Sequence, residues 1–277
     1  MKQSLSEWLV DQQASVNRSP ITPRVPLFFD GHELGSVEAE GFANFADEVG
    51  LSDLVGRLEG HGTQEPGWFL VNPSAVSLNR LAHAMRLHHY AQVAHLWRGE
   101  QLAVRSHKGE PLVTVERGAV RALGITTQGV HLHGCTADRQ VWIQQRAQDK
   151  KTHPGRWDTL MGGMVSAADT LEHALARETA EEAGLALAQL NGLRRVSHFT
   201  MRCPNATDSG LEYVVERIDW FEGVVPEGVV PVNTDGEVQQ FRLVSPAVLT
   251  RMLLEGVFTP EAGLILGQWL LSLAKMA

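Results

Sequence analysis

Three glutamates in one short segment have a spacing that suits shared chemistry. Residues 177–182 read R-E-T-A-E-E and place Glu178, Glu181 and Glu182 at positions i, i+3 and i+4. On a helix these carboxylates share one face, where like charges raise one another's pKa and destabilise the helix unless a positive charge lies among them. A hard divalent cation, Mg²⁺ or Mn²⁺, meets this need, since such ions take oxygen ligands and leave sites for water and phosphate. A solvated acidic helix face is the alternative interpretation.

The residues around the glutamates resemble the Nudix box. That box is a Gly, five residues, a Glu and seven residues, followed by Arg-Glu-aliphatic-x-Glu-Glu-x-Gly-aliphatic. The positions of this chain that match it are Gly163, Arg177, Glu178, Glu181, Glu182, Gly184 and Leu185. Asp169 stands where Glu is usual, and Thr179 stands where an aliphatic residue is usual. Asp169 is one methylene shorter than Glu, so its contact with Arg177 or with the metal is expected to change, whereas Thr179 is close in shape to Val.

The resemblance implies hydrolysis of a diphosphate linkage of a small molecule, assisted by a divalent metal. It makes Glu178 and Glu182 the main expected metal ligands, with Glu181 close behind. The carbonyl of Gly162 or Gly163 is expected to complete the metal shell, as it often does in the family. Arg177 is expected to hold a carboxylate of the box by a charged hydrogen bond.

The general base stays open at this stage, because Nudix enzymes recruit it from different places. The candidates are Glu237, Glu212 and the box glutamates. Glu237 lies on a loop before a strand, a position from which it could reach the metal cluster. A solvent-exposed acidic residue in a turn is the alternative interpretation of Glu237.

Candidate substrate contacts precede the box. Lys150 and Lys151 come before a Pro-Gly turn at residues 154–155 and could meet the phosphates of a substrate. Trp157 could stack on a heteroaromatic ring, or it could pack under the loop that carries it. Gly162 and Gly163 provide backbone freedom directly before the box.

Residues outside the box resemble a subgroup of Nudix hydrolases. They include the W-I-Q-Q-R run at 142–146, Lys150, the Pro-Gly pair and the D-G-E-V run at 235–238. This subgroup contains the domain fused to fungal thiamine pyrophosphokinases, and the likeness extends from about residue 25 to residue 270. It implies thiamine diphosphate or its oxidised analogues as substrate, with phosphate and a monophosphate as products. Nucleoside diphosphate derivatives, dinucleotides and coenzyme A remain alternatives.

Two other classes of function compete with hydrolysis. The loop and box also resemble isopentenyl diphosphate isomerase, a metal-dependent proton-transfer enzyme whose acid/base cysteine would fall at Met161 in this chain. Neither Cys135 nor Cys203 is near that position in the sequence, which argues against the isomerase. A non-catalytic Nudix binding module is the second alternative, motivated by Asp169 and Thr179.

Composition agrees with a globular enzyme that acts on a small molecule. The chain has 277 residues, 43% of them hydrophobic, and a formal net charge of −8, which disfavours nucleic acid or an anionic membrane as partner. Two cysteines provide neither a disulfide framework nor a zinc-binding pattern. The sequence shows no signal peptide and no run of about 18 apolar residues, so a cytoplasmic location is expected.

The elements that must position these residues alternate between helices and strands. Helices are expected at residues 4–17, 77–93, 170–183, 246–255 and 261–276. Strands are expected at residues 25–29, 34–37, 68–71, 102–106, 112–115, 129–135, 141–146, 196–201, 213–221 and 238–244. The predicted class is α+β: a Nudix α/β/α sandwich with a mixed sheet at residues 116–277, after a smaller α+β domain at residues 1–115. The first domain could act as a lid or as the surface of a homodimer.

Overall fold

A seven-stranded mixed sheet forms the centre of the molecule. The computed structural model describes residues 3–60, 66–106, 108–205 and 210–276. The strands are β7 (Thr126–Cys135), β8 (Val141–Arg146), β9 (Trp157–Asp158), β10 (Met161–Met164), β11 (Asn191–Pro204), β12 (Tyr213–Val224) and β13 (Val238–Val244). Their order is β11-β12-β7-β8-β13, with β10 paired to β7 and β9 paired to β8. Only the β7–β12 pair is parallel among these strands as described.

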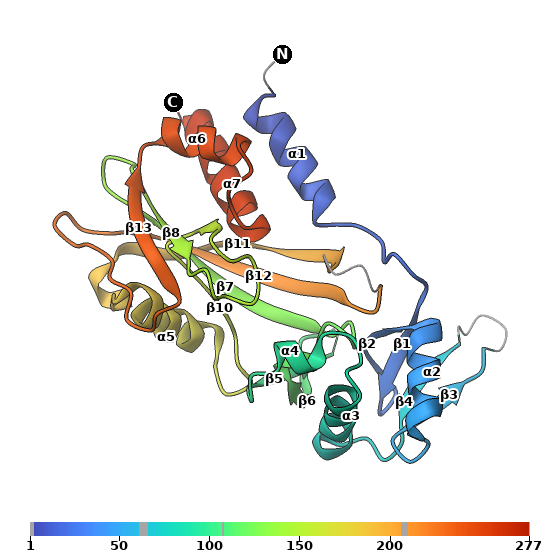
Figure 1. The fold of residues 1–277 in the computed structure, drawn as a ribbon. Coiled ribbons are helices and arrows are strands. Elements are labelled where there is room, and N and C mark those ends of the chain that lie inside the picture. The colour runs from blue at the N-terminus through green and yellow to red at the C-terminus, as the bar shows by residue number, and fades with distance from the viewer. Residues whose placement is uncertain (1–2, 61–65, 107, 206–209, 277) are drawn as a thin grey trace.

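Helices cover both faces of this sheet (Figure 1). On β8, Val141 and Ile143 pack with α6 (Pro246–Leu254) and α7 (Pro260–Met276), whereas Trp142 packs in the cluster that contains residues of α5 (Leu171–Ala183). Because side chains alternate across a strand, α5 and the α6–α7 pair lie on opposite faces. The predicted helix–sheet–helix sandwich is therefore confirmed.

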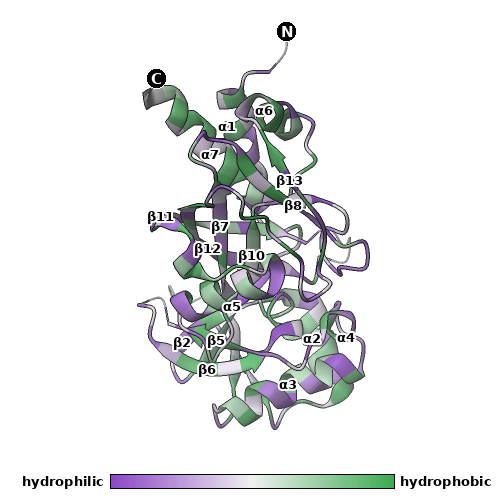
Figure 2. Ribbon diagram, turned by 90° about the vertical axis from the view of Figure 1, so that its left-hand side faces the viewer, coloured by the Kyte–Doolittle hydropathy of each residue, from purple (hydrophilic) through white to green (hydrophobic). Residues whose placement is uncertain are grey.

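A smaller α+β part precedes the sandwich. Its four strands have the order β2-β1-β4-β3, and a hairpin of β5 and β6 follows. The strands are β1 (Arg24–Phe29), β2 (His32–Glu38), β3 (Val55–Leu58), β4 (Gly67–Leu70), β5 (Gln101–Arg105) and β6 (Pro111–Glu116). The helices are α2 (Ala39–Val49), α3 (Ala75–Leu87), α4 (Val93–Leu96) and the short 3-10 turn Arg117–Ala119. In Figure 2 this part lies at one end of the molecule, and α1, α6 and α7 lie at the other.

The two parts have separate apolar cores, but the first helix does not pack with its neighbours in sequence. One core contains buried side chains from Leu27 to Ile125. Trp8 and Leu9 of α1 (Leu5–Ser15) belong instead to the core of α6 and α7. Trp8 lies over the backbone of α7, where a Cβ atom at Gly263 would be 3.3 Å from its ring. The domain boundary near residue 115 stays a prediction.

Most predicted elements are confirmed, and the structure adds several that the sequence patterns do not predict. The helices at α1, α5, α6 and α7 and the strand at β13 agree with the sequence patterns within about two residues. Strand β10 was not expected, because its sequence M-G-G-M has no β-branched or aromatic residue; pairing with β7 alone makes it a strand. Helix α2 and strands β3 and β9 were also not expected. No helix in the described ranges is long and apolar enough to cross a membrane.

Candidate active site

Helix α5 carries the box glutamates, and its two ends are capped. The Thr170 hydroxyl accepts a hydrogen bond from the backbone N–H of His173 (3.2 Å) and satisfies a donor of the first turn. Gly184 ends the helix with φ of +64°, a conformation that glycine adopts without a Cβ penalty. Thr179 is fully buried and donates its hydroxyl to the carbonyl of Leu175 (2.6 Å), so the helix tolerates this departure from the box.

The end of α5 lies directly against β10. Glu182 is 2% exposed, and its carboxylate accepts hydrogen bonds from the N–H of Gly162 (3.1 Å) and from Nε2 of Gln144 (2.8 Å). Burial raises the pKa of Glu182 to about 8 although both hydrogen bonds act to lower it. One helical turn earlier, the Glu178 side chain occupies the space that a Cβ atom at Gly163 would need. Both carboxylates therefore converge on the Gly162–Gly163 backbone, and a Cβ atom at the second position would displace the Glu178 side chain.

Arg177 connects the acidic residues of the box. Its guanidinium donates to Asp169 through Nε (3.1 Å) and Nη2 (2.8 Å), and its Nη1 lies 3.0 Å from both Glu178 and Glu181. Burial opposes ionisation of Asp169, yet these bonds hold its pKa below the usual value. The shorter Asp169 side chain therefore still reaches Arg177 in a two-bond geometry.

The box residues offer donor chemistry that suits a hard cation. Burial raises the pKa of Glu178 despite the opposing effect of Arg177, and Glu181 is 47% exposed. In this conformation Arg177, Gln144 and the Gly162 N–H hold the carboxylates. Among the described residues no three His, Cys, Asp or Glu side chains converge on a point that could hold a metal ion. Glu178 and Glu182 nevertheless bring two carboxylates, one of them fully buried, to the same backbone segment, and Mg²⁺ typically needs only one or two.

Glu237 and Lys150 form an ion pair beside the box. Burial acts to raise the pKa of Glu237, but the hydrogen bond and charge of Lys150 lower it below the ordinary value. The charge of Glu237 is close enough to Glu178 to raise the pKa of Glu178 further. Glu237 is therefore an ionised carboxylate within electrostatic reach of the cluster. Glu212 lies just before β12 and accepts a hydrogen bond from Asn205 (2.6 Å).

Trp157 lies in the core on the α6–α7 side of the sheet. It is 8% exposed, and the guanidinium of Arg242 lies 5.4 Å from the centre of its ring. Substrate stacking on Trp157 would require the ring to leave this position, so the structure favours the packed interpretation.

Buried polar residues with no predicted role in the site support it. Gln144 faces α5 from β8 and fixes Glu182. Asp158 is buried, accepts the N–H of Thr159 (2.8 Å) and lies 3.5 Å from Arg146 and 3.6 Å from His131. The only sequence signal was the presence of polar residues inside apolar strands, and their partners depend on the pairing of distant segments.

Comparisons with known proteins show which family the region around the box is similar to. Residues 128–262 match the NUDIX domain family. An uncharacterized protein of Saccharomyces cerevisiae is 26% identical over 207 residues, which is 70% of this chain and 60% of that protein. Nudix hydrolase 20, chloroplastic, of Arabidopsis thaliana is 28% identical over 148 residues, 50% of this chain and 37% of that protein. The isopentenyl-diphosphate Delta-isomerase of Leifsonia xyli subsp. xyli is 27% identical over 112 residues, 39% of this chain and 59% of that protein. The chain spans less than two thirds of each of these relatives.

His133, on the opposite face of the sheet from α5, generates a prediction about stability. Its side chain is fully buried against Trp269, with ring centroids 4.5 Å apart, and neither ring nitrogen has a hydrogen-bond partner among the described residues. Burial lowers the pKa of His133 to about 3. In the unfolded chain the pKa of this histidine is about 6.5. Below that pH the unfolded chain binds a proton that the folded chain does not, so the free energy of unfolding decreases as the pH is lowered.

We expect His133→Phe to remove this acid sensitivity. Between pH 6.5 and 5.5 the wild-type protein should lose about 1 kcal/mol more unfolding free energy than the variant, as measured by urea denaturation. The comparison uses the change between the two pH values, so a change in absolute stability caused by the new side chain does not affect it. An equal pH dependence in both proteins would contradict the prediction.

Proposed function

We propose that this chain, which carries a NUDIX domain over residues 128–262, is a divalent-metal-dependent hydrolase of a diphosphate linkage. The observation that carries the proposal is the convergence of Glu178 and Glu182 on the Gly162–Gly163 backbone. A relative named a Nudix hydrolase supports the same reaction class.

The proposed metal ligands are Glu178 and Glu182, with Glu181 as a further ligand and a carbonyl of Gly162 or Gly163 completing the set. The bound cation, Mg²⁺ or Mn²⁺, would neutralise phosphoryl charge and lower the pKa of a water. Gln144 and the Gly162 N–H fix the Glu182 carboxylate. Arg177 orients Glu178 and Glu181 while Asp169 anchors its guanidinium.

We propose Glu237 as the general base. Lys150 keeps its carboxylate ionised, which is the form that can accept a proton from water. Lys150 is placed by the same ion pair beside the box, where its charge can also meet a substrate phosphate. Glu212 and the box glutamates are the alternative general bases. Activity that survives substitution of Glu237 would favour one of them.

The proposed substrates are thiamine diphosphate and its oxidised analogues, cleaved to phosphate and a monophosphate. This choice is supported by the resemblance of the flanking runs at 142–146 and 235–238 to enzymes of that subgroup. Proton transfer of the isomerase type is less compatible with the site, because the fully buried Met161 stands at the cysteine position. Cys135 follows the β7 partner of Met161 by three residues, on the order of 10 Å along the strand. A cytoplasmic location and a homodimer stay predictions.

Incubation with a panel of diphosphates tests the class and the substrate together. With Mg²⁺ or Mn²⁺ present, thiamine diphosphate or an oxidised analogue should yield phosphate and the corresponding monophosphate, identified by mass spectrometry. The panel should include isopentenyl diphosphate. Isomer formation without phosphate release would establish the isomerase reaction instead, and no turnover of any compound would favour a binding module.

Glu182→Gln should lower kcat at least a hundredfold on whichever compound is hydrolysed. The amide keeps the size of the side chain but removes the charge that holds the cation. Glu172→Gln is the matched control, because it makes the same change at an exposed position of the same helix and should stay within twofold of the wild type. Retained activity in Glu182→Gln would remove this carboxylate from the mechanism.

A further inference from the structure

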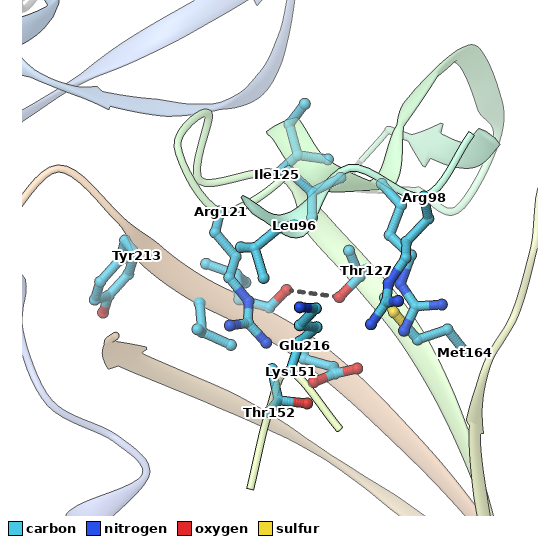
Figure 3. A pocket seen from close by; sticks show the side chains of 14 residues that line it. Leu96, Arg98, Arg121, Ile125, Thr127, Lys151, Thr152, Met164, Tyr213 and Glu216 are labelled. Carbon is cyan, nitrogen blue, oxygen red and sulfur yellow. Dashed lines mark hydrogen bonds between the residues drawn. The ribbon is translucent and has the colours of Figure 1, made fainter. Parts of the chain in front are cut away.

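A small basic pocket lies where the first part of the chain meets the NUDIX domain (Figure 3). The first part contributes Leu96 and Arg98, and the segment after β6 contributes Arg117, Arg121 and Ile125. The NUDIX domain completes the pocket with Lys151 from the loop after β8, Met164 of β10 and Glu216 of β12. In Figure 3 the guanidinium groups of Arg98 and Arg121 approach the pocket from opposite sides.

The charges of this pocket are not balanced by the protein. Four cationic side chains line it, and within the described part of the chain no carboxylate lies at ion-pair distance from Arg98, Arg121 or Lys151. Arg117 is paired with Glu100 (2.7 Å). The one acidic side chain of the lining is Glu216. Burial and the charge of Glu261 raise the pKa of Glu216 to about 7, and the charges of Arg121 and Arg117 oppose this increase. The pocket therefore carries a net positive charge at neutral pH.

Met164 and Arg117 connect the basic pocket with the region of the box. Met164 follows Gly163 directly; its carbonyl accepts from Arg177 (3.5 Å), and the residue also lines the pocket. Arg117 lies within electrostatic reach of both sites, because its charge lowers the pKa of Glu216 in the pocket and of Glu237 beside the box. A substrate whose diphosphate meets the box glutamates could therefore extend into this pocket.

The pocket has room for a small group only. Its volume is about 70 Å³, far below the roughly 300–1,000 Å³ of pockets that enclose whole organic ligands. A phosphoryl group fits this description, whereas a ring system does not. A terminal phosphoryl group carries a charge of about −1.5 to −2 at neutral pH, more than a phosphate esterified on both sides, so it is the better match to the three cations that lack an ion-pair partner.

We infer that this pocket binds the terminal phosphoryl group of the substrate, so that the enzyme selects diphosphate monoesters over diphosphates esterified at both ends. The inference rests on the proposed diphosphate hydrolysis. It gives the first part of the chain a role in specificity, because Arg98 and the neighbouring Arg117 and Arg121 come from outside the matched domain. Under this selection, thiamine diphosphate and nucleoside diphosphates, which have a free terminal phosphoryl group, would be preferred to dinucleotides, which have none.

Calorimetric titration with inorganic pyrophosphate in metal-free buffer containing EDTA tests the pocket without any requirement for hydrolysis. Wild-type protein should bind pyrophosphate, and Arg121→Gln and Arg98→Gln should each raise Kd at least tenfold. Lys151→Gln, in an exposed loop where folding is not at risk, should raise it at least threefold. Arg80→Gln is the matched control, since Arg80 pairs with Asp53 on the surface (2.8 Å) and should leave Kd within twofold. Dimethyl pyrophosphate, capped at both ends, should bind the wild type at least tenfold more weakly.

The outcomes separate this inference from the proposed function. Unchanged affinity in Arg121→Gln and Lys151→Gln, or an equal loss in Arg80→Gln, would overturn the pocket assignment. Equal affinity for the capped and uncapped compounds would overturn the selection of free ends. Glu182→Gln should still bind pyrophosphate in EDTA, so a failure of hydrolysis alone leaves the pocket result standing.

Discussion

The contact between the end of α5 and the Gly162–Gly163 backbone is the constraint on which the site depends. The N–H of Gly162 is bonded to Glu182, and the Glu178 side chain fills the space beside Gly163. This approach requires β10 to be held in register on β7, with Gly163 opposite Val130. It also requires Gln144 to face α5 from β8. The sheet, the helix and the glycine pair therefore place two carboxylates together, and neither the helix nor the strand could do so alone.

Electrostatics explains why this arrangement is poised for a cation. Arg177 contacts Asp169, Glu178 and Glu181, so one positive charge serves three acids. Among the described residues no cationic side chain pairs with Glu182, and burial raises the pKa of this carboxyl to about 8. A divalent cation would supply the positive charge that the three acids around Arg177 and the buried Glu182 lack, since it favours the ionised form of every carboxylate near it. The positive pocket beyond Met164 adds a second, separate field that suits the far end of a diphosphate.

The sequence predicts those features of the site that depend on local spacing. The helix at 170–183, its C-terminal glycine and the shared face of Glu178 and Glu182 follow from helical periodicity and capping. The residues that contact these glutamates cannot be predicted from local spacing. Gln144 reaches Glu182 across 38 positions, and β10 is a strand only because β7 pairs with it. Trp157 could not be assigned to the core before the packing of α6 and α7 was known. The basic pocket combines Arg98, Arg121 and Lys151 from three separate segments, so no single stretch of sequence carries its pattern.

The proposed hydrolysis depends on a divalent-cation site formed by Glu178 and Glu182 on the Gly162–Gly163 backbone. Titration of the protein with Mn²⁺, with free ion followed by electron paramagnetic resonance, tests it most directly. The wild type should bind Mn²⁺, and Glu178→Gln should weaken this binding at least tenfold while a change at the exposed Glu172 of the same helix leaves it unaltered. Equal Mn²⁺ affinity in the wild type and in Glu178→Gln would contradict the claim, as would a wild type that binds no Mn²⁺.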